Sequence, residues 1–272
     1  TGSISAPGAS GVVLGAAAGV RSGTAGSTDP LVGVFTDGLL YIDTYATGGK
    51  VELYNAVSGY TTNTSLPVLL VNTLSYLTGN EGSVVINALT PGSQPSSISA
   101  VSGAAIVGTD IAINSTINHT SMASESGLQI IASGSLTVTA AVGGGGDVTM
   151  SNSGTGGITI SGNVVGDTNK SGSGGVYITN TGKNAPTVIS GNVTSYGDEI
   201  EIEGAGPMNI SGNVLAADDD VYITNFGSAS GNTTTISGNV TALDYLEIYN
   251  LGALSSHLNI SGTLTSDYEV DV

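Results

Sequence analysis

The chain has 272 residues, of which 39% are apolar, 42 are Gly and none is Cys or Trp. It contains 21 acidic and four basic residues, which gives a formal net charge of −17. Nucleic acids and anionic lipids are held through Lys and Arg, so this balance argues against nucleic acid as a partner and against a membrane-surface protein. No apolar run approaches the roughly 20 residues of a membrane helix, so membrane insertion is not expected.

Residues 1–30 are rich in Gly, Ala and Ser and contain one apolar stretch, at 12–20. Two interpretations are open for this segment. It is either a flexible leader or a strand donated to a neighbouring subunit, because a lone apolar strand gains hydrogen bonds by pairing with an exposed sheet edge.

Residues 31–125 are predicted to form an irregular, β-rich N-terminal region of the fold. Runs of Val, Ile, Leu and Tyr are separated by Gly, Asn, Ser or Pro, and no segment shows a sustained helical period. Strands are predicted at 39–42, 51–54, 68–71, 84–86 and 111–113, and the series continues at 128–131. A boundary is placed near residue 125, and a more regular region follows at 126–272. The chain is therefore predicted to be all-β.

One phrase recurs in the C-terminal region. Ile-Ser-Gly-Asn-Val stands at 160–164, 189–193, 210–214 and 236–240, and it returns as Ile-Ser-Gly-Thr-Leu at 260–264. The offsets between successive starts are 29, 21, 26 and 24 residues. A phrase that returns at unequal spacing is typical of stacked β-coils whose loops differ in length. The sequence thus predicts a parallel β-helix (β-solenoid) of about ten coils, less regular in its N-terminal part.

A second phrase follows the first. Val-Tyr-Ile-Thr-Asn occurs at 176–180 and 221–225, with divergent copies Ile-Glu-Ile-Glu-Gly at 200–204 and Leu-Glu-Ile-Tyr-Asn at 246–250. Period-two alternation directs the first and third residues of each copy into the core. The second positions then form an outer row in which Tyr and acid mostly alternate: Tyr177, Glu201, Tyr222, Glu247 and Asp271.

The Gly-Asn pair inside the first phrase predicts a corner of the coil. Gly and Asn both tolerate positive φ, so Gly191-Asn192 and its equivalents can form the turn. Two interpretations of the Asn are open. Its side-chain amide bonds to the equivalent amide one coil away, as in cross-β ladders, or it is a solvated turn residue.

Three segments carry a resemblance to a known family. Ile-Ser-Gly-Asn-Val-Thr at 189–194, Asp-Glu-Ile-Glu-Ile at 198–202 and Gly-Thr-Asp-Ile-Ala-Ile-Asn at 108–114 resemble the passenger repeats of filamentous haemagglutinin-type and autotransporter surface proteins. The likeness extends over residues 105–272. It implies a right-handed parallel β-helix that is exported to the bacterial exterior.

Acidic residues are concentrated near the end of the chain. Twelve acids and no base follow Lys183, and six aspartates fall seven to ten residues after the Ile of their phrase. This spacing predicts that they line one edge of the stack. The six candidate metal ligands are Asp198, Asp218, Asp219, Asp220, Asp244 and Asp267. Oxygen ligands without His or Cys favour Ca²⁺, and a solvated acidic rim is the other interpretation. No complete Asp-x-Asp-x-Asn-Gly loop is present.

No catalytic or cofactor-binding residue is assigned. Carboxylates are plentiful, but the chain has no Trp on which a sugar could stack. His119 and His257 lie far apart in the sequence and outside any nucleophile motif. A non-enzymatic role is therefore expected, with a β-helix protein that binds or cleaves carbohydrate as the alternative.

The last coil enters its second strand at 268–272 without a capping element. Solenoids need caps to remain soluble, and uncovered sheet edges pair with other chains. Two explanations are open: the chain is cut from a longer β-helix, or its open end docks on another subunit and builds a fibre. We expect an extracellular or cell-surface structural protein that associates with itself end to end. It would be a subunit of a fibre, matrix or layer, or the rod of an adhesin, and a glycan or a host-cell-surface ligand is a further candidate partner.

Overall fold

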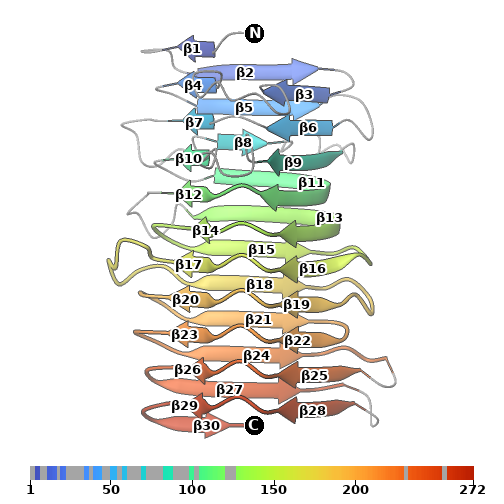
Figure 1. Ribbon diagram of the computed structural model, residues 1–272, viewed down its shortest axis with the longest axis vertical. Helices are drawn as coiled ribbons and strands as arrows, with labels where there is room; N and C mark the ends of the chain where they lie inside the picture. Colours follow the sequence, from blue (N-terminus) through green and yellow to red (C-terminus); the bar gives the residue numbers. More distant parts are fainter. Residues whose placement is uncertain are drawn as a thin grey trace.

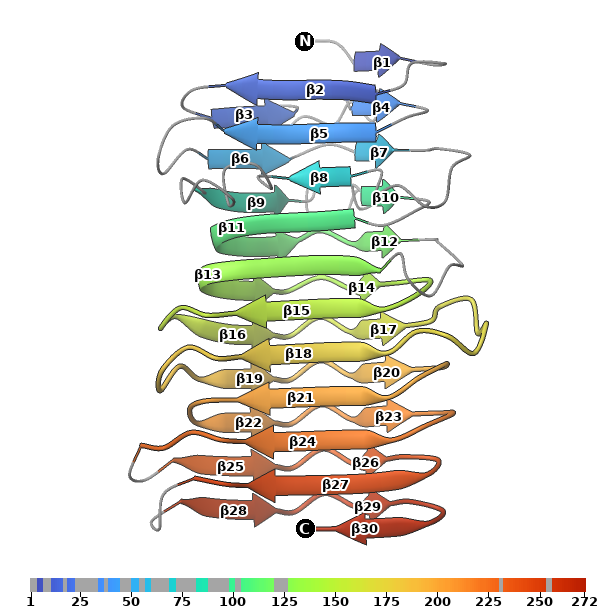
Figure 2. The same ribbon diagram turned by 180° about the vertical axis from the view of Figure 1, so that it is seen from behind.

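Short strands that end at polar turns stack into three parallel ladders, here called A, B and C (Figures 1 and 2). The computed structural model describes residues 4–6, 11–16, 19–22, 34–36, 39–44, 50–53, 57–59, 69–71, 82–87, 98–100, 104–119, 127–229, 232–252 and 256–272. Side chains are described at Val51, at 82–86 and in the ranges from residue 104 onward. The chain passes from ladder B to C to A in each coil.

Each ladder contains one strand segment from every coil, and all of its pairings are parallel. Ladder A has eleven strands: β1 (Ile4–Ala6), β4 (Val34–Thr36), β7 (Val57–Gly59), β10 (Ile98–Ala100), β12 (Ile117–His119), β14 (Val142–Gly143), β17 (Val164–Gly166), β20 (Val193–Ser195), β23 (Val214–Ala216), β26 (Val240–Thr241) and β29 (Leu264–Thr265). Ladder B comprises β2 (Gly11–Ala16), β5 (Leu39–Thr44), β8 (Leu69–Val71), β11 (Ala104–Asn114), β13 (Leu128–Val138), β15 (Val148–Asn152), β18 (Val176–Asn180), β21 (Ile200–Gly204), β24 (Val221–Asn225), β27 (Tyr245–Asn250) and β30 (Glu269–Asp271).

Ladder C comprises β3 (Gly19–Ser22), β6 (Lys50–Leu53), β9 (Ser83–Asn87), β16 (Gly157–Ile160), β19 (Thr187–Ile189), β22 (Met208–Ile210), β25 (Thr233–Ile236) and β28 (His257–Ile260). Strands β11 and β13 run round the corner between ladders B and C. The first half of β11 pairs with β8 and its second half with β9. These two strands join ladders B and C into one hydrogen-bonded sheet.

The prediction of an all-β parallel solenoid is confirmed, and every expected strand from 39–42 to 128–131 is present. Seven coils lie between residues 104 and 265, fewer than the ten expected, and strands β2 to β10 add three less continuous returns before them. The regular coils begin at Ala104, ahead of the boundary expected near residue 125. Within residues 4–22, strands β1, β2 and β3 pair with β4, β5 and β6 of the same chain.

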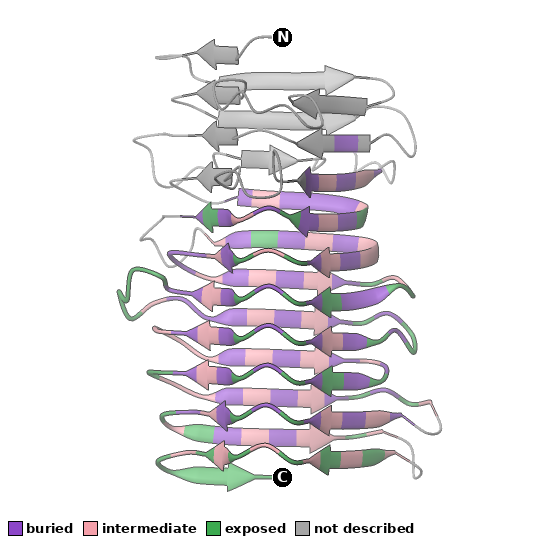
Figure 3. Ribbon diagram, viewed as in Figure 1, coloured by how far each residue is buried: buried purple, intermediate pink, exposed green. Residues whose placement is uncertain are grey.

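The core is the narrow space enclosed by the three ladders (Figure 3). Alternate residues point inward along the strands of the second phrase, β15, β18, β21 and β24, as the sequence predicted, and the first and third residues of the Val-Tyr-Ile-Thr-Asn copies are fully buried. The Ile of the repeated phrase stacks in register through β16, β19, β22, β25 and β28. Burying one such side chain contributes about 1.5–3 kcal/mol, so a continuous aliphatic column holds the coils together.

The repeated phrase forms the corner between ladders C and A, but its Gly is needed for a different reason from the one expected. None of the Gly-Asn pairs has positive φ; among described residues, only Asp167, Lys170, Asn184, Gly157 and Gly172 do. A Cβ on the corner glycines would lie about 2 Å from the carbonyl oxygen of the preceding coil, a distance of 1.9 Å at Gly212. The absence of a side chain therefore lets successive corners approach.

The Asn of the corner does form a ladder, and its geometry differs from the predicted amide-to-amide bond. Asn163 Oδ1 accepts the backbone N–H of Asn192 at 3.1 Å, and Asn192 Oδ1 accepts that of Asn213 at 3.0 Å. The series continues to Thr263, whose N–H donates to Asn239 Oδ1 at 3.0 Å. An amide-to-amide bond occurs instead at the buried corner between ladders B and C, where the side chain of Asn152 donates to Asn180 at 3.0 Å.

We expect Gly212→Ala to lower the free energy of unfolding by about 3 kcal/mol, because its methyl group must displace the Gly191 carbonyl. Gly143→Ala is the matched control, since its nearest neighbour would be the Thr168 methyl group at 3.1 Å, and it should cost no more than about 1 kcal/mol. Urea denaturation followed by circular dichroism measures both. Equal losses would contradict the proposed role of the corner.

Candidate functional site

The six predicted aspartates lie in the loops that lead from ladder A into ladder B, and they are called the acidic rim below. Strands β21, β24 and β27 pair through Ile200, Val221 and Leu246. The residues two positions earlier are Asp198, Asp219 and Asp244, so these three occupy equivalent places in three successive coils. Hydrogen-bonded stacking of the coils therefore sets carboxylates above one another, about 4.8 Å apart along the stack.

The other three members lie beside this line. Asp220 is one residue later than Asp219, at the level of Glu199 in the coil before. Asp218 and Asp267 are equivalent to each other, but Leu243 stands at that position in the coil between them. The structure thus brings four of the six predicted residues together and leaves Asp218 and Asp267 apart.

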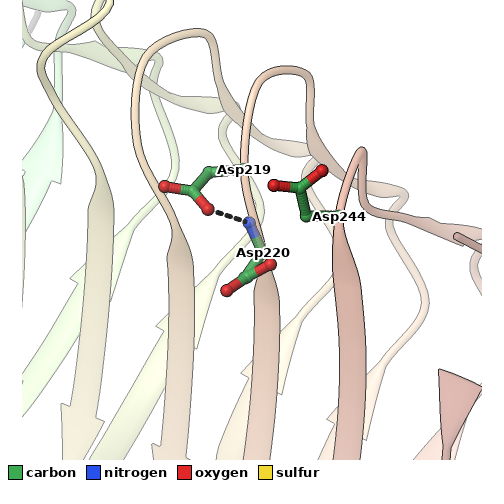
Figure 4. Close-up of side chains that lie close together, drawn as sticks. All are labelled: Asp219, Asp220 and Asp244. Atoms are coloured by element: carbon green, nitrogen blue, oxygen red, sulfur yellow. Dashed lines mark hydrogen bonds between the residues drawn. The ribbon is translucent and has the colours of Figure 1, made fainter. Parts of the chain in front are cut away.

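Asp219, Asp220 and Asp244 form the tightest group of the rim (Figure 4). One carboxylate oxygen of each lies within 4.8 Å of the others. The backbone N–H of Asp220 donates to Asp219 Oδ1 at 3.0 Å. All three side chains are partly exposed, so a cation could reach them from solvent.

Asp220 is fixed by two further donors. The hydroxyl of Tyr222 donates to its Oδ2 at 2.6 Å, and the backbone N–H of Tyr245 in the next coil donates to its Oδ1 at 2.7 Å. Both oxygens of Asp220 are therefore engaged. Asp219 and Asp244 are the rim carboxylates better placed to take an oxygen-seeking cation such as Ca²⁺.

Stacked acids shift one another's protonation. Burial raises the pKa of Asp219, and the charge of Asp220 and a hydrogen bond with Asp198 raise it further. Burial also raises the pKa of Glu199, where Asp198 and Glu201 add like-charge repulsion. Asp219 and Glu199 therefore hold their protons more tightly than isolated carboxyl groups do.

Asp147 belongs with the rim, although the sequence analysis did not include it. Val148 pairs with Val176, and Val176 with Ile200, so Asp147 stands where Glu199 and Asp220 stand in later coils. Its Oδ1 accepts the Gly175 N–H at 3.0 Å, and its pKa is raised by burial, with Asp198 adding to the shift. The sequence offers one signal for it: Asp147 stands directly before Val-Thr-Met-Ser-Asn at 148–152, which is a further copy of the second phrase.

The outer row of alternating Tyr and acid is confirmed. Tyr177, Glu201, Tyr222 and Glu247 pair directly from strand to strand, and Asp271 continues the row. Tyr249 lies two residues after Glu247 on β27, and its hydroxyl donates to Asp271 Oδ2 at 3.1 Å. This hydrogen bond, together with the nearby negative charges, raises the pKa of Tyr249 to about 12. Tyr222 and Tyr249 thus donate hydrogen bonds to carboxylates on the acidic side of the stack.

Other residues weighed in the sequence do not join this site. His119 is buried in β12 on ladder A, and His257 is exposed in β28 on ladder C. Within the described parts of the chain, no helix is long and apolar enough to cross a membrane.

Comparison with known proteins gives no match: no protein-family model, curated protein or solved structure is significantly similar to the chain. The function of the chain is therefore inferred from the geometry of the solenoid and of its acidic rim.

We expect the protein to become more stable as the pH falls from about 7.5 to about 5. The pKa values of Asp147, Glu199, Glu203 and Asp219 are raised above ordinary values of 3.8 for Asp and 4.5 for Glu, chiefly by burial. A raised folded-state pKa contributes stability that is complete below the unfolded-state value and is lost as the pH rises through the folded-state value. The melting temperature should therefore increase on mild acidification.

Differential scanning calorimetry across this range, with Asp219→Asn as the comparison, measures the effect. The variant removes one of the repelling charges and should show a weaker dependence. A melting temperature that falls steadily from about pH 7.5 to about pH 5 would contradict the interpretation.

Proposed function

We propose that the protein is a non-enzymatic, extracellular structural protein: a subunit of a cell-surface fibre, matrix or layer, or the rod of an adhesin. The observation that carries this proposal is the in-register stacking of one phrase, residue on residue, through five successive coils. The resemblance to haemagglutinin-type and autotransporter passengers favours the same role.

A solenoid of this kind is suited to a mechanical task. Backbone hydrogen bonds in the three ladders run along the long axis, and the core beneath them is a continuous aliphatic column. Each coil contacts its immediate neighbours, so stiffness is added coil by coil. Loops of unequal length then project from a rigid support.

Assembly through the ends of the stack is part of the proposal, with a second copy of the chain as the partner. In the coil formed by β27, β28 and β29, the inward side chains of β28 and β29 are only partly covered: Leu258, Ile260 and Leu264 pack against the core, and Val270 of β30 is 43% exposed. The same three ladders run from β1, β2 and β3 to this coil. A second copy could therefore continue all three in register, while the acidic rim would repel a copy set out of register.

Glycan binding or cleavage is the second candidate, and one observation favours it. Tyr245 and Tyr268 stack with ring centroids 5.8 Å apart, and both rings are exposed, beside the rim at Asp244. Aromatic faces next to carboxylates are a common means of holding a sugar. A glycan array and a reducing-sugar assay test it; robust turnover that is lost in Asp219→Asn would replace the structural proposal.

We expect the purified chain to form filaments or rods longer than one copy in negative-stain electron microscopy. Leu264→Lys places a charge on the partly covered end and should shift the sample to single copies by analytical ultracentrifugation. Thr265→Lys, at the neighbouring exposed position, should leave assembly intact. Circular dichroism verifies that both variants fold, and a wild-type chain that remains a single copy at high concentration would refute assembly through the ends.

A further inference from the structure

The loop between β17 and β18 carries a pattern that the acidic rim does not share. Its sequence from residue 167 is Asp-Thr-Asn-Lys-Ser-Gly-Ser, which places oxygen-bearing side chains at Asp167, Asn169 and Ser171 and a Gly at 172. An EF-hand-type Ca²⁺ loop uses positions 1, 3 and 5 in this way, requires Gly at 6 and adds the carbonyl oxygen of position 7. The match covers positions 1 to 7 only: Ser stands at the fifth position in place of Asp or Asn, and the twelfth position, which is Glu in an EF-hand, is Ile178.

The backbone of the loop follows the sharp turn that this ligand order needs. Lys170 and Gly172, at the fourth and sixth positions, have left-handed φ values of 54° and 78°. The N–H of Lys170 donates to the carbonyl oxygen of Asp167 at 2.9 Å, which closes the turn. A non-glycine residue with positive φ is uncommon, so the conformation at Lys170 is set by the loop as a whole and not by its own preference.

The side chain of Asp167 is held at the centre of this turn. Its Oδ1 accepts the backbone N–H of Ser171 at 2.9 Å and the Ser171 hydroxyl at 2.8 Å, and its Oδ2 accepts the N–H of Gly172 at 2.8 Å. The residue is buried. These hydrogen bonds fix the carboxylate at the first position of the loop.

Neighbouring coils hold the loop in place. Thr168 N–H donates to the carbonyl oxygen of Gly144 in the coil before, at 2.8 Å. The ammonium group of Lys170 lies 4.3 Å from the ring centre of Tyr196 in the coil after. Residues 168–172 are all exposed, and Figure 1 shows the β17–β18 connection projecting beyond its neighbours. Asn169 and Ser171 are therefore open to solvent on a pre-formed support, whereas Asp167 is buried.

We propose that residues 167–173 form a Ca²⁺-binding loop, with oxygen ligands from Asp167, Asn169, Ser171 and the carbonyl group of Ser173. Binding requires the Ser171 hydroxyl to turn away from Asp167. That rotation frees a lone pair on Asp167 Oδ1 and directs the Ser171 oxygen toward the ion, while the two backbone N–H bonds keep the carboxylate in position. With one carboxylate in the loop, the affinity should be in the range of about 10⁻⁴–10⁻³ M of extracellular Ca²⁺ modules.

Isothermal titration of the full chain with CaCl₂ tests the proposal, together with amide NMR spectra that report on Gly172. Asn169→Leu removes an exposed oxygen and should weaken binding about tenfold or more. Asn169→Asp adds a second carboxylate at the same place and should tighten binding about tenfold. A gain of affinity cannot arise from misfolding, so the pair remains informative even if one variant is less stable.

The rim variant Asp219→Asn/Asp244→Asn is the matched control, and it should leave the loop titration and the Gly172 shift unchanged. Three results would overturn the proposal. These are no binding up to about 10 mM Ca²⁺, binding that is lost in the rim variant but not in Asn169→Leu, and equal affinity of the Asn169→Asp and wild-type chains.

Discussion

The close approach of successive corners governs the rest of the structure. From the second Ile-Ser-Gly-Asn-Val phrase onward, the carbonyl oxygen of one glycine lies where a side chain on the next glycine would be, and two backbone N–H groups share the carbonyl of the Ile in the preceding coil. Coils can stack at the spacing of a parallel sheet only if this contact is kept. Once it is kept, register in all three ladders is fixed, and a one-residue slip would turn the aliphatic column outward.

In-register stacking also explains the electrostatics. A residue type repeated at one place in each coil forms a row along the stack. Rows of Ile and Val pack together in the core, whereas Asp198, Asp219 and Asp244 repel one another because they carry the same charge. The chain limits this repulsion through tyrosine hydroxyl groups, through backbone donors such as the Tyr245 N–H, and through raised pKa values. The same geometry produces both the aliphatic column of the core and the row of carboxylates at the rim.

The sequence allowed the solenoid, its strands, its buried residues and the outer row of Tyr and acid to be predicted, because alternation and repetition act locally. The position of the corner was predicted correctly, but the reason for its Gly was not. Gly is needed there because the backbones of successive coils come close together, and the conformational preferences of single residues do not reveal such a contact. For the acidic rim, the sequence predicted only that its aspartates line one edge of the stack. The hydrogen bonds from Tyr222 and Tyr245 to Asp220 depend on how neighbouring coils pair, and so does the place of Asp147 beside the rim. The sequence alone does not give these pairings. The loop at Asp167 departs from the EF-hand motif at its fifth position, which is Ser171, and at its twelfth, which is Ile178, so the motif alone does not identify it.

The corner asparagines have a consequence for how such a chain can change. Each Asn side chain accepts a hydrogen bond from the backbone N–H of the following coil, and the side chain at that position takes no part in the bond. Thr263 therefore donates at the same distance, 3.0 Å, as Asn213 and Asn239. A new coil needs only to offer an N–H group at that point. Duplication or loss of a repeat would then leave every remaining bond of this ladder intact, and the length of the rod could vary between generations while its diameter stayed the same.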